Sequence, residues 1–598
     1  MRNSSTFTVA ARYRRSLRAW RGGASMPGAR RQHGAVAVLA VIWLSIAIAA
    51  LGAIDIGNVF AVRRQLQRTA DLAAMAAVQV ISTSGACTTA TAAAQQNAAS
   101  NGFTADGTKT ILNTTCGRWD TSSNTYFGTT GNPLNAVQVQ TSQVVPYLFL
   151  GPSRTVTATS TAFASNIDAF SLGTGIATIN TQQSALLNAI LGGLLNTSVS
   201  LSVGDMQSLA TAHVSLGNLM VALGAANMQG LLATTVSYQT LMVAMVKALQ
   251  AGGDTVNAAI LQTLAVAIPG GQNITLGDGG KSAPGLLALG LANPNAAATA
   301  TINAFDALLV AAQIAQRSPD GSQGNAPVIN VAASLAGLAN ISLQILNPPA
   351  LAVGEGGTTT VNGVTTSRTI ARTAVVNLAL SLAPLPPLYL GIATISVLST
   401  PVVVTLAVAP GTATLDPVNC ESTKAATQAT IQVTPGIASL CVGANASCPS
   451  SSSGTVNVAS VSLLGSPAVA ITLNNLGPYQ ISPGTTPVTI NGSSGSFDVT
   501  PPPVNSNALG SDLASLSTTL FQQLPTALSV SVLGSSILNG LLTPILSLVT
   551  TALTPVLQGV FSLLNTLIVP TLSLLGVQVG TATLHNMSLT CGVSQLVN

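Results

Sequence analysis

"RRQHGAVAVLAVIWLSIAIAALGAIDIGNVFAVRRQLQRTADLAAMAAVQVI", residues 30–81, changes character half-way along its length. The run from Ala35 to Ile54 holds twenty residues without a single charge. As a helix that rises about 1.5 Å per residue, such a run crosses a hydrocarbon core of about 30 Å. The first half of the stretch therefore predicts a membrane-spanning helix.

The second half of the stretch is amphipathic. Its apolar residues mostly recur three or four positions apart, and its polar residues lie largely on the other face. No glycine–proline pair or turn cluster interrupts residues 58–82, so we expect one helix of about 45 residues, half in a membrane and half outside it. The apolar face comprises Val59, Val62, Leu66, Ala73, Ala77 and Val80, and the polar face Arg63, Arg64, Gln67, Arg68 and Asp71.

We expect the apolar run to be retained as an anchor. The apolar region of a signal peptide is usually shorter, and small-residue matches to a cleavage site, such as Ala47-Ile48-Ala49, lie inside the run. Arginine before the run, without any acid, orients the N-terminus to the cytoplasm and exports the rest, although Arg63, Arg64 and Arg68 weaken the contrast. The preceding arginines are Arg2, Arg12, Arg14, Arg15, Arg18, Arg21, Arg30 and Arg31.

Composition and charge narrow the class of protein. Of the 598 residues, 6% are charged, 3% are aromatic and 47% are hydrophobic, which is enough apolar material to build cores and argues against disorder. Residues 1–68 carry eleven Arg and one Asp, whereas residues 69–598 carry nine Lys or Arg against fourteen Asp or Glu. Because no basic patch lies outside the N-terminus, we expect no nucleic-acid binding. The low content of charged and aromatic residues is typical of an extracytoplasmic envelope protein.

Every cysteine lies on the side that we expect to be exported. An even number in an oxidising compartment indicates disulfides, and the alternative is that some are buried thiols. Cys87 and Cys116 are candidates for a bond that closes a loop of about thirty residues and stabilises a small domain by about 3 kcal/mol. The other four allow three pairings, among which the sequence does not choose: Cys420, Cys441, Cys448 and Cys591.

Small residues recur every four positions inside the apolar run. On a helix this spacing places them on one face, where a second helix can approach closely. In so alanine-rich a segment, chance explains the pattern equally well. The candidate helix-association face comprises Ser45, Ala49, Ala53 and Gly57.

Residues 30–165 resemble a known family. The basic lead "RRQHGAVAVLA", the helix "AIDIGNVFAVRRQLQRTADLAAMAA" and the downstream "AAAQQNAASNGF", "GRWD" and "NAVQVQTSQVVPYLF" resemble TadE/TadG-like proteins of Flp (Tad) pilus assembly over about residues 30–165. The most distinctive run is D-x-G-x6-R-x-L-Q-x3-D, here Asp55, Gly57, Arg64, Leu66, Gln67 and Asp71.

The resemblance implies a single-pass inner-membrane protein with the bulk of its chain in the periplasm, and with pilus-assembly proteins or pilins as partners. It implies no cofactor and no small-molecule substrate. Prepilin processing in the resembling families needs Gly before the cut and usually Glu at the fifth position after it. Here Gly34 is present, but Leu39 occupies the fifth position, so we expect no cleavage.

Local signals after the long helix fit a pilin-like α+β domain. "TTATAAAQQNAAS" predicts a short helix that ends at Asn101-Gly102. "TKTILNTTC", "NAVQVQTSQV" and "RTVTATSTAFA" are β-rich runs separated by turn residues. The fold class that we expect is α+β, with a membrane helix, a pilin-like helix and small sheet, and a large extracytoplasmic region rich in helices and strands.

Changes in local amino-acid composition divide the chain into further segments. The last segment, from 513 on, carries no charge, and Pro544, Pro555 and Pro570 divide it into pieces too short for a second span; packing on protein and contact with a membrane surface stay open. The expected segments are a cytoplasmic tail (1–33), a transmembrane helix (34–55), a pilin-like domain (56–165), a helix-rich segment (166–278), a loop-rich connection (279–327), a β-rich domain (328–498), a linker (499–512) and uncharged amphipathic helices with closing strands (513–598).

The sequence offers few groups for catalysis or metal binding. His33 is cytoplasmic, and His213 and His585 are isolated in the sequence. No nucleophile elbow, P-loop or zinc motif occurs, and Asp320 in "DGSQG" lacks the second Ser of a metal-adhesion motif. We therefore expect no catalytic, cofactor or metal site. The leading hypothesis is a structural component of pilus assembly; the alternative is an independent surface or adhesin-like envelope protein.

Overall fold

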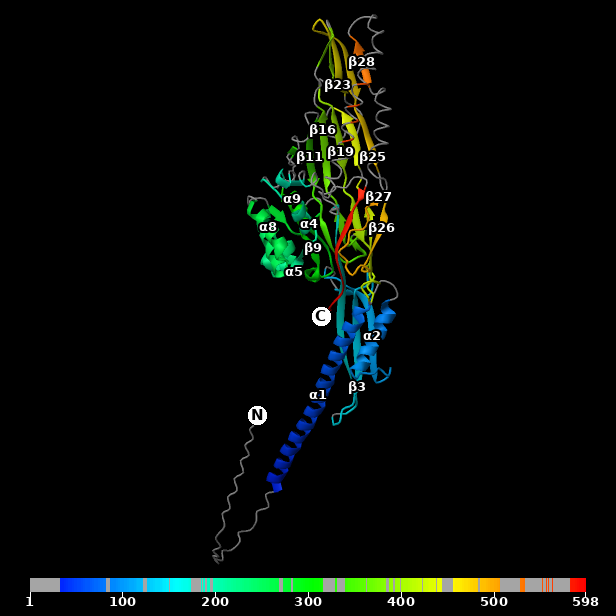
Figure 1. Ribbon diagram of the computed structural model, residues 1–598. Helices are drawn as coiled ribbons and strands as arrows, with labels where there is room; N and C mark the ends of the chain where they lie inside the picture. The colour runs from blue at the N-terminus through cyan, green and yellow to red at the C-terminus, as the bar shows by residue number, and fades with distance from the viewer. Residues whose placement is uncertain are drawn as a thin grey trace, which may run out of the picture. The chain divides into compact units, whose positions relative to one another are not determined.

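The protein was analysed as a computed structural model (Figure 1). It forms two compact units: Met1–Arg64 with Val144–Val156, and Gln65–Gln143 with Thr157–Asn598. The structure describes residues 33–81, 86–121, 126–149, 151–173, 197–267, 273–280, 283–315, 328–330, 339–361, 363–382, 387–390, 393–397, 400–421, 423–436, 438–443, 455–481, 484–505, 528–532 and 581–597, with single positions between 184 and 193 and between 551 and 562.

The long helix is continuous, as the sequence predicts. Helix α1 covers His33–Gln79, 47 residues, and ends where the periodic pattern ends. A second helix, α2 (Ala86–Ser100), follows. It terminates at Gly102, whose φ of 83° is a left-handed conformation that favours glycine. The amide of Phe103 donates to the carbonyl of Ala98 at 2.9 Å, which satisfies one of the last helical acceptors.

Strand β4 is the centre of the first sheet. It covers Arg154–Leu172, and its central and final residues pair with strands from distant parts of the chain. The order of the described strands is β2-β1-β3-β4-β12-β8, with β30 also paired to β4. Their bounds are β1 Thr110–Trp119, β2 Phe127–Gly128, β3 Ala136–Val145, β8 Leu287–Gly290, β12 Leu351–Gly354 and β30 Leu584–Val597. The three predicted β-rich runs are thus β1, β3 and the start of β4.

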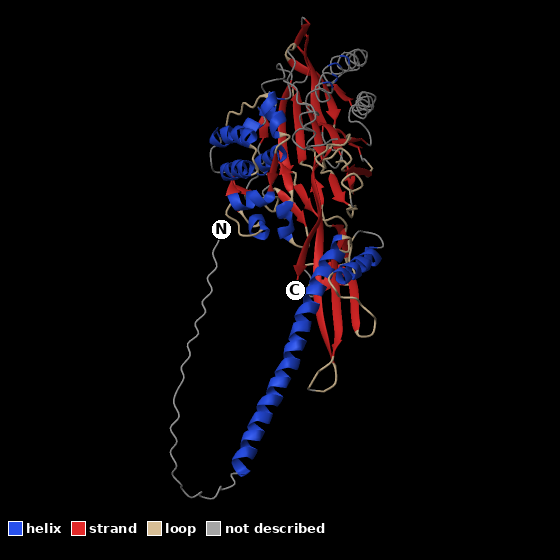
Figure 2. Ribbon diagram, turned by 60° about the horizontal axis from the view of Figure 1, so that its bottom comes forward, coloured by secondary structure: helices blue, strands red, loops and turns tan. Residues whose placement is uncertain are grey.

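A group of short helices lies beside the strands of the second unit (Figure 2). Ser215 and Ser237 begin two of them, because each side chain accepts a hydrogen bond from an amide in the first turn. The group comprises α4 Val203–Leu209, α5 Leu216–Ala222, α6 Met228–Leu232, α7 Tyr238–Ala251, α8 Thr255–Ala267, η1 Pro294–Thr299 and α9 Ala304–Ala315, with the short strands β5 His213–Ser215, β6 Thr235–Ser237, β7 Asn273–Thr275 and β9 Thr301–Asn303.

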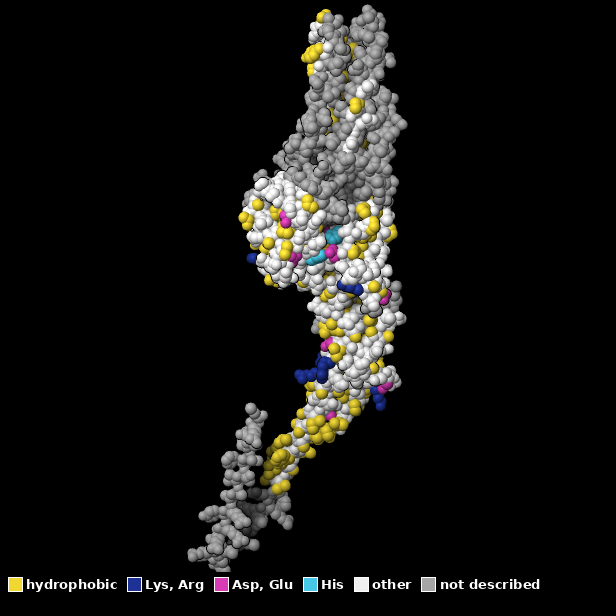
Figure 3. Space-filling model, in the orientation of Figure 1, with side chains coloured by type: hydrophobic (Ala, Val, Ile, Leu, Met, Phe, Trp, Pro, Cys, Tyr) yellow, Lys and Arg dark blue, Asp and Glu magenta, His cyan; other side chains and the backbone are white. Residues whose placement is uncertain are grey.

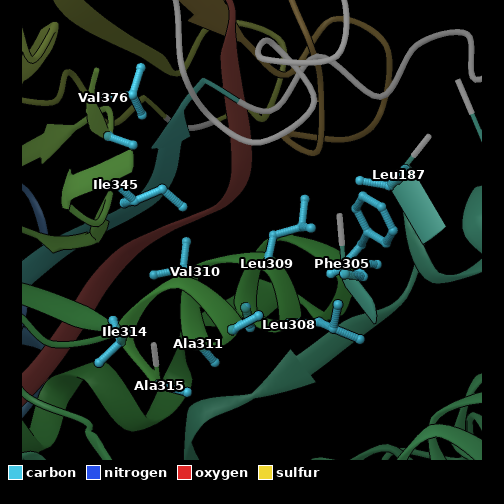
Figure 4. Close-up of a cluster of buried hydrophobic side chains, with 14 of the residues drawn as sticks. Leu187, Phe305, Leu308, Leu309, Val310, Ala311, Ile314, Ala315, Ile345 and Val376 are labelled. Atoms are coloured by element: carbon cyan, nitrogen blue, oxygen red, sulfur yellow. The ribbon is translucent and has the colours of Figure 1, made fainter. Parts of the chain in front are cut away.

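Helix α9 is the buried element of this group. All twelve of its residues are buried, and all except Asp306 and Gln313 are apolar, as expected for a helix enclosed in a core. Phe305, Leu308 and Leu309 project into a shared apolar cluster, which Ile345 and Val376 of the neighbouring β-region join (Figure 4). The helices and the β-rich region of the second unit therefore share one core.

The remaining described strands build further antiparallel sheets. One has the order β10-β11-β16-β19-β22-β25, another β17-β18-β23-β24-β28 and a third β15-β20-β21-β26, with the pairs β13-β14 and β27-β29. The bounds are β10 Val328–Asn330, β11 Ala339–Asn347, β13 Thr358–Val361, β14 Val364–Ser367, β15 Ile370–Arg372, β16 Val375–Leu382, β17 Leu388–Leu390, β18 Ala393–Val397, β19 Val403–Val408, β20 Thr412–Leu415, β21 Gln428–Thr434, β22 Ala438–Gly443, β23 Thr455–Leu463, β24 Ser466–Asn474, β25 Leu476–Ile481, β26 Thr486–Asn491, β27 Val504–Asn505, β28 Leu528–Val532 and β29 Thr581–Ala582.

The structure confirms the α+β class, and it differs from the expected segments at three places. Strand β4 continues to Leu172, past the expected boundary at residue 165. Helix α9 lies within the expected loop-rich connection of residues 279–327. Within the expected linker, Val499 forms a bridge with Asn586 and β27 pairs with β29. Backbone pairing over long sequence separations, which turn residues do not reveal, accounts for the first and third differences.

Candidate functional site

The first half of α1 is exposed and apolar on every side. Its most apolar 18-residue window is only 6% buried, and Val36, Trp43 and Ile48 are each more than half exposed. Hydrophobic side chains cover this part of the helix in the space-filling view (Figure 3). In water such a surface is strongly unfavourable, whereas in lipid it is not. Among the described residues α1 is the one helix long and apolar enough to cross a membrane.

The predicted small-residue face is open. Ser45, Ala49, Ala53 and Gly57 are all exposed. A Cβ added at Gly57 would meet no atom within 4 Å. The hydroxyl of Ser45 donates to the carbonyl of Val41 at 2.8 Å, so it is satisfied within its own helix. The face is therefore geometrically available to a second helix.

Asp55, at the end of the apolar run, has a structural partner that the sequence did not reveal. Its side chain is only 1% exposed. One carboxylate oxygen accepts a hydrogen bond from the amide of Leu148 at 2.8 Å, and the other accepts one from the amide of Phe149 at 2.9 Å. A buried carboxylate requires such donors. Asp55 therefore holds the loop that follows β3 against α1.

The other motif residues have separate roles. Leu66 is fully buried, and its carbonyl accepts a hydrogen bond from the Thr141 hydroxyl of β3 at 3.1 Å. Gln67 donates to Asp71 at 2.8 Å and to the carbonyl of Thr159 in β4 at 3.3 Å. Arg64 is exposed. The structure thus explains the Leu and Gln of the motif by packing on the sheet and leaves Arg64 to the solvent.

Disulfides join segments of the second unit. Cys87 of α2 is bonded to Cys116 of β1, and Cys420 is bonded to Cys591 of β30. The second bond closes 171 residues and selects one of the three pairings that the sequence left open. Cys441 is buried in β22, and Cys448 lies outside the described residues.

A buried ion pair connects β1 to the turn after β12. Arg118 and Glu355 are 4% and 2% exposed, and Nη2 of Arg118 lies 2.7 Å from Oε2 of Glu355. The hydroxyl of Ser165 in β4 donates to Oε1 of Glu355 at 2.8 Å. In the sequence, "GRWD", which contains Arg118, is recognisable only as a family feature, and nothing near it indicates the acidic partner. The scarcity of acids in the chain is the one signal that could have drawn attention to Glu355.

The two histidines that are isolated in the sequence meet in the fold. Oδ1 of Asp498 lies 3.0 Å from Nε2 of His585, and its Oδ2 lies 3.2 Å from Nε2 of His213. Nδ1 of His585 lies 3.1 Å from Asp306, which also accepts a hydrogen bond from Ser171 at 2.7 Å. Although they are isolated in the sequence, β5 and β30 bring both histidines to the same aspartate.

Electrostatics fixes the charge state of this cluster. Burial by itself would lower the pKa of His585, but the hydrogen bonds and charges of Asp306 and Asp498 outweigh burial and raise it to about 10. Burial likewise opposes ionisation of Asp498, and its two histidines hold its pKa below the usual range. The described residues contain no group of three or more His, Cys, Asp or Glu arranged to hold a metal ion. Asp320 lies outside the described residues.

Three family models match parts of the chain. Residues 34–80 match the family model for TadE/G-like Flp pilus-assembly proteins, and residues 75–162 match the model for Tad-like Flp pilus-assembly proteins. These matches support a TadG-like protein of the Tad family over the N-terminal segment. Residues 183–313 match a model described as a domain of unknown function, which covers the helices α4 to α9. No curated protein and no solved structure matches the chain.

The matched families and the apolar helix together support a membrane-anchored, pilus-assembly-like protein. The families are structural components of Flp pilus assembly and not enzymes. The two matched segments meet within the second half of α1.

Replacing Asp55 by Ala should loosen the loop at residues 146–149. The amides of Leu148 and Phe149 then lose their acceptors, at about 1–3 kcal/mol each when they stay buried. Hydrogen–deuterium exchange there should speed up about tenfold or more. Asp55→Asn keeps one acceptor oxygen and should have a smaller effect. Asp71→Ala, which removes the partner of Gln67, is the control and should leave the loop unchanged; equal exchange in Asp55→Ala and wild type would contradict this role.

Removing one partner of the Arg118–Glu355 pair should destabilise the protein more than replacing both partners by apolar residues. Glu355→Gln leaves the buried guanidinium with only the more distant Asp120, 3.8 Å from Nε, as a countercharge and should lower the free energy of unfolding by about 3–5 kcal/mol. The double variant Arg118→Met/Glu355→Met should cost less than the sum of the single variants Arg118→Met and Glu355→Met, because neither charge is then buried without the other. Denaturation of the purified full-length protein, followed by the fluorescence of the neighbouring Trp119, measures both. Strictly additive losses would show that the two charges do not interact.

The His585 cluster should make stability fall at alkaline pH. The folded-state pKa of about 10 exceeds the ordinary value of 6.5, so the stabilisation is complete below about pH 6.5 and is lost as the pH rises towards about 10. Burial raises the pKa of Asp168 from 3.8 to about 7, outweighing hydrogen bonds with Asn586 and the Ala169 backbone. The stability that comes from protonated Asp168 is therefore lost separately, as the pH rises from 3.8 to about 7.

The readout is therefore the difference in unfolding free energy between wild type and His585→Gln from about pH 6 to about pH 9, which should shrink as the pH rises. His213→Gln is the matched control. Its ring is 30% exposed and closer to solvent, so we expect a smaller loss from it. A difference that stays constant over this range would contradict the assignment of a charged His585.

Proposed function

We propose that the protein is a retained, single-pass component of Flp pilus assembly, with its N-terminus in the cytoplasm and its large second unit in the periplasm. The observation that carries this proposal is α1 itself. One continuous helix has an exposed apolar half, suited to lipid, and a second half whose Leu66, Ala73 and Ala77 are fully buried. Both halves lie within residues that match Tad-family models.

Charge and disulfides support the orientation. Eight arginines precede the apolar run, and the positive-inside rule places such a lead in the cytoplasm. Cys87–Cys116 and Cys420–Cys591 belong to the other side, where an oxidising compartment preserves such bonds. We infer that Cys441 pairs with Cys448, because the other four cysteines bond with one another.

The loop held by Asp55 supports a boundary between lipid and water at this level of α1. Its side chains Leu148 and Phe149 are 67% and 52% exposed, although both are apolar. Exposed apolar side chains that lie together mark a contact with a membrane or with another protein. Asp55 therefore marks the outer end of the span, and the carboxylate avoids the hydrocarbon by accepting two amide hydrogen bonds.

We further propose that the small-residue face of α1 binds a transmembrane helix of another pilus-assembly protein or pilin. Small side chains let two helix backbones approach closely, and this is the contact that stabilises helix pairs in lipid. Ser45, Ala49, Ala53 and Gly57 present such a face, and all four are exposed. Because Leu39 replaces the usual Glu after Gly34, we expect the helix to stay uncleaved and the protein to remain in the membrane.

Tags at both ends, cell fractionation and protease access test the proposal. A full-length species in the inner membrane, digested only after the outer membrane is opened, is the expected result. A shortened species in the sheared pilus fraction, with the C-terminal tag alone, would overturn retention and indicate a fibre subunit. Normal piliation in a deletion strain would instead favour the independent envelope protein.

A matched pair of variants tests the helix face. Ala49→Leu fills the face and should reduce both piliation and co-purification of other pilus proteins. Ala47→Leu adds the same side chain about 200° around the helix and should leave both unchanged. Membrane insertion should be equal in the two variants, because both remain apolar. Equal effects on piliation would contradict a specific helix contact.

A further inference from the structure

A cleft in the second unit lies between the loop after β1 and the strand β13. Its volume is about 460 Å³, which is within the range of small-molecule sites in proteins. Arg118, Asp120 and Tyr126 line it from one part of the chain, and Thr359 and Arg368 line it from another. None of these residues belongs to the anchor or to the helix face discussed above.

The charges of the cleft are balanced. Arg118 is paired with the buried Glu355 at 2.7 Å, and Nη1 of Arg368 lies 3.4 Å from Oδ2 of Asp120. Burial lowers the pKa of Arg368, and the nearby Arg118 lowers it further, while Glu355 and Asp120 oppose the change. Two cations facing two carboxylates give no net field for an anion, so the site favours a neutral, polar ligand.

Arg118 forms the wall of the cleft and is not a donor that a ligand can reach. Its side chain is only 4% exposed, and its Nη1 donates to the carbonyl of Pro133 at 3.0 Å. The polar groups of the cleft that a ligand can reach are the partly exposed side chains of Arg368 and Asp120, 13% and 21% exposed, and the threonine hydroxyls.

An aromatic side chain stands at the rim. Tyr126 is 50% exposed and stacks on Trp119, with ring centroids 5.5 Å apart and planes inclined by 24°. Its φ of 54° is a left-handed conformation that bulky residues rarely adopt. Such strain persists where the surroundings hold it and is concentrated at binding sites. The stacked pair presents a rigid apolar ring beside hydroxyl and guanidinium groups.

We propose that this cleft binds a neutral saccharide. Sugar hydroxyls both donate and accept hydrogen bonds, and the cleft supplies both kinds of partner: the guanidinium of Arg368 as a donor, the Asp120 carboxylate as an acceptor and the threonine hydroxyls as either. The C–H face of a sugar ring packs on the exposed aromatic ring. The site is independent of the proposed role in pilus assembly, because it shares no residue with the membrane helix.

Saturation-transfer NMR on the full-length protein tests the proposal, in a detergent without a sugar headgroup. The probes are N,N′-diacetylchitobiose, cellobiose, maltose and methyl mannoside, with acetate and phosphate as anionic comparisons. We expect at least one saccharide to receive magnetisation and neither anion to compete with it. Transfer to no saccharide, or displacement of a bound saccharide by acetate or phosphate, would overturn the proposal, and the second result would point to an anion site.

Variants of the rim locate the binding. Tyr126→Gly removes the ring while keeping a residue that adopts positive φ readily, so lost binding would not reflect backbone misfolding. It should weaken saccharide binding about fivefold to tenfold, and Tyr126→Phe should bind like wild type. Thr359→Val should weaken binding without changing the fold. Tyr389→Ala removes another exposed tyrosine, 75% exposed, outside the cleft, and should bind normally; unchanged binding in Tyr126→Gly would overturn the assignment to this cleft.

Discussion

Backbone pairing along β4 is the constraint on which the second unit depends. This strand of 19 residues carries the pilin-like sheet on its N-terminal part, and its later residues pair with β12 and β30. Residues 161–172 of β4 pair with the last strand of the chain, more than 400 positions away. Buried backbone groups must be paired, so the pilin-like domain and the C-terminal strand form one sheet. The disulfide between Cys420 and Cys591 adds a covalent tie to the same strand.

Two of the buried charge pairs of the second unit join segments that are far apart in the sequence. Arg118 and Glu355 lie 237 positions apart, and His585 lies 279 positions from Asp306. Both pairs are buried or nearly so. In a chain with only 6% charged residues, a buried charge without its partner would be strongly destabilising. An incorrect association of these segments would bury a charge without its partner and would therefore be unstable, whereas their apolar residues alone would not distinguish the correct association.

The first unit is subject to a different constraint, because no described part of the chain buries the apolar half of α1. Lipid is the environment that suits the exposed apolar half of α1, and Asp55 marks the point at which polar groups begin. Its carboxylate and the amides of Leu148 and Phe149 satisfy one another, so a charged residue is tolerated at the edge of an apolar span. The exposed apolar helix and the loop held by Asp55 thus belong to the first unit, while the cleft with Tyr126 belongs to the second.

Local order was readable from the sequence. The length of α1, the end of α2 at Gly102 and the first three long strands follow from periodicity, capping and turn residues, which act over a few positions. The family resemblance rested on the same local features. What only the tertiary structure decided was which distant residues meet: β30 on β4, Glu355 beside Arg118, and both histidines on Asp498. For each of these contacts the sequence offers several partners of the same chemistry. Only the shared core and the pairing of backbone groups determine which partner is used.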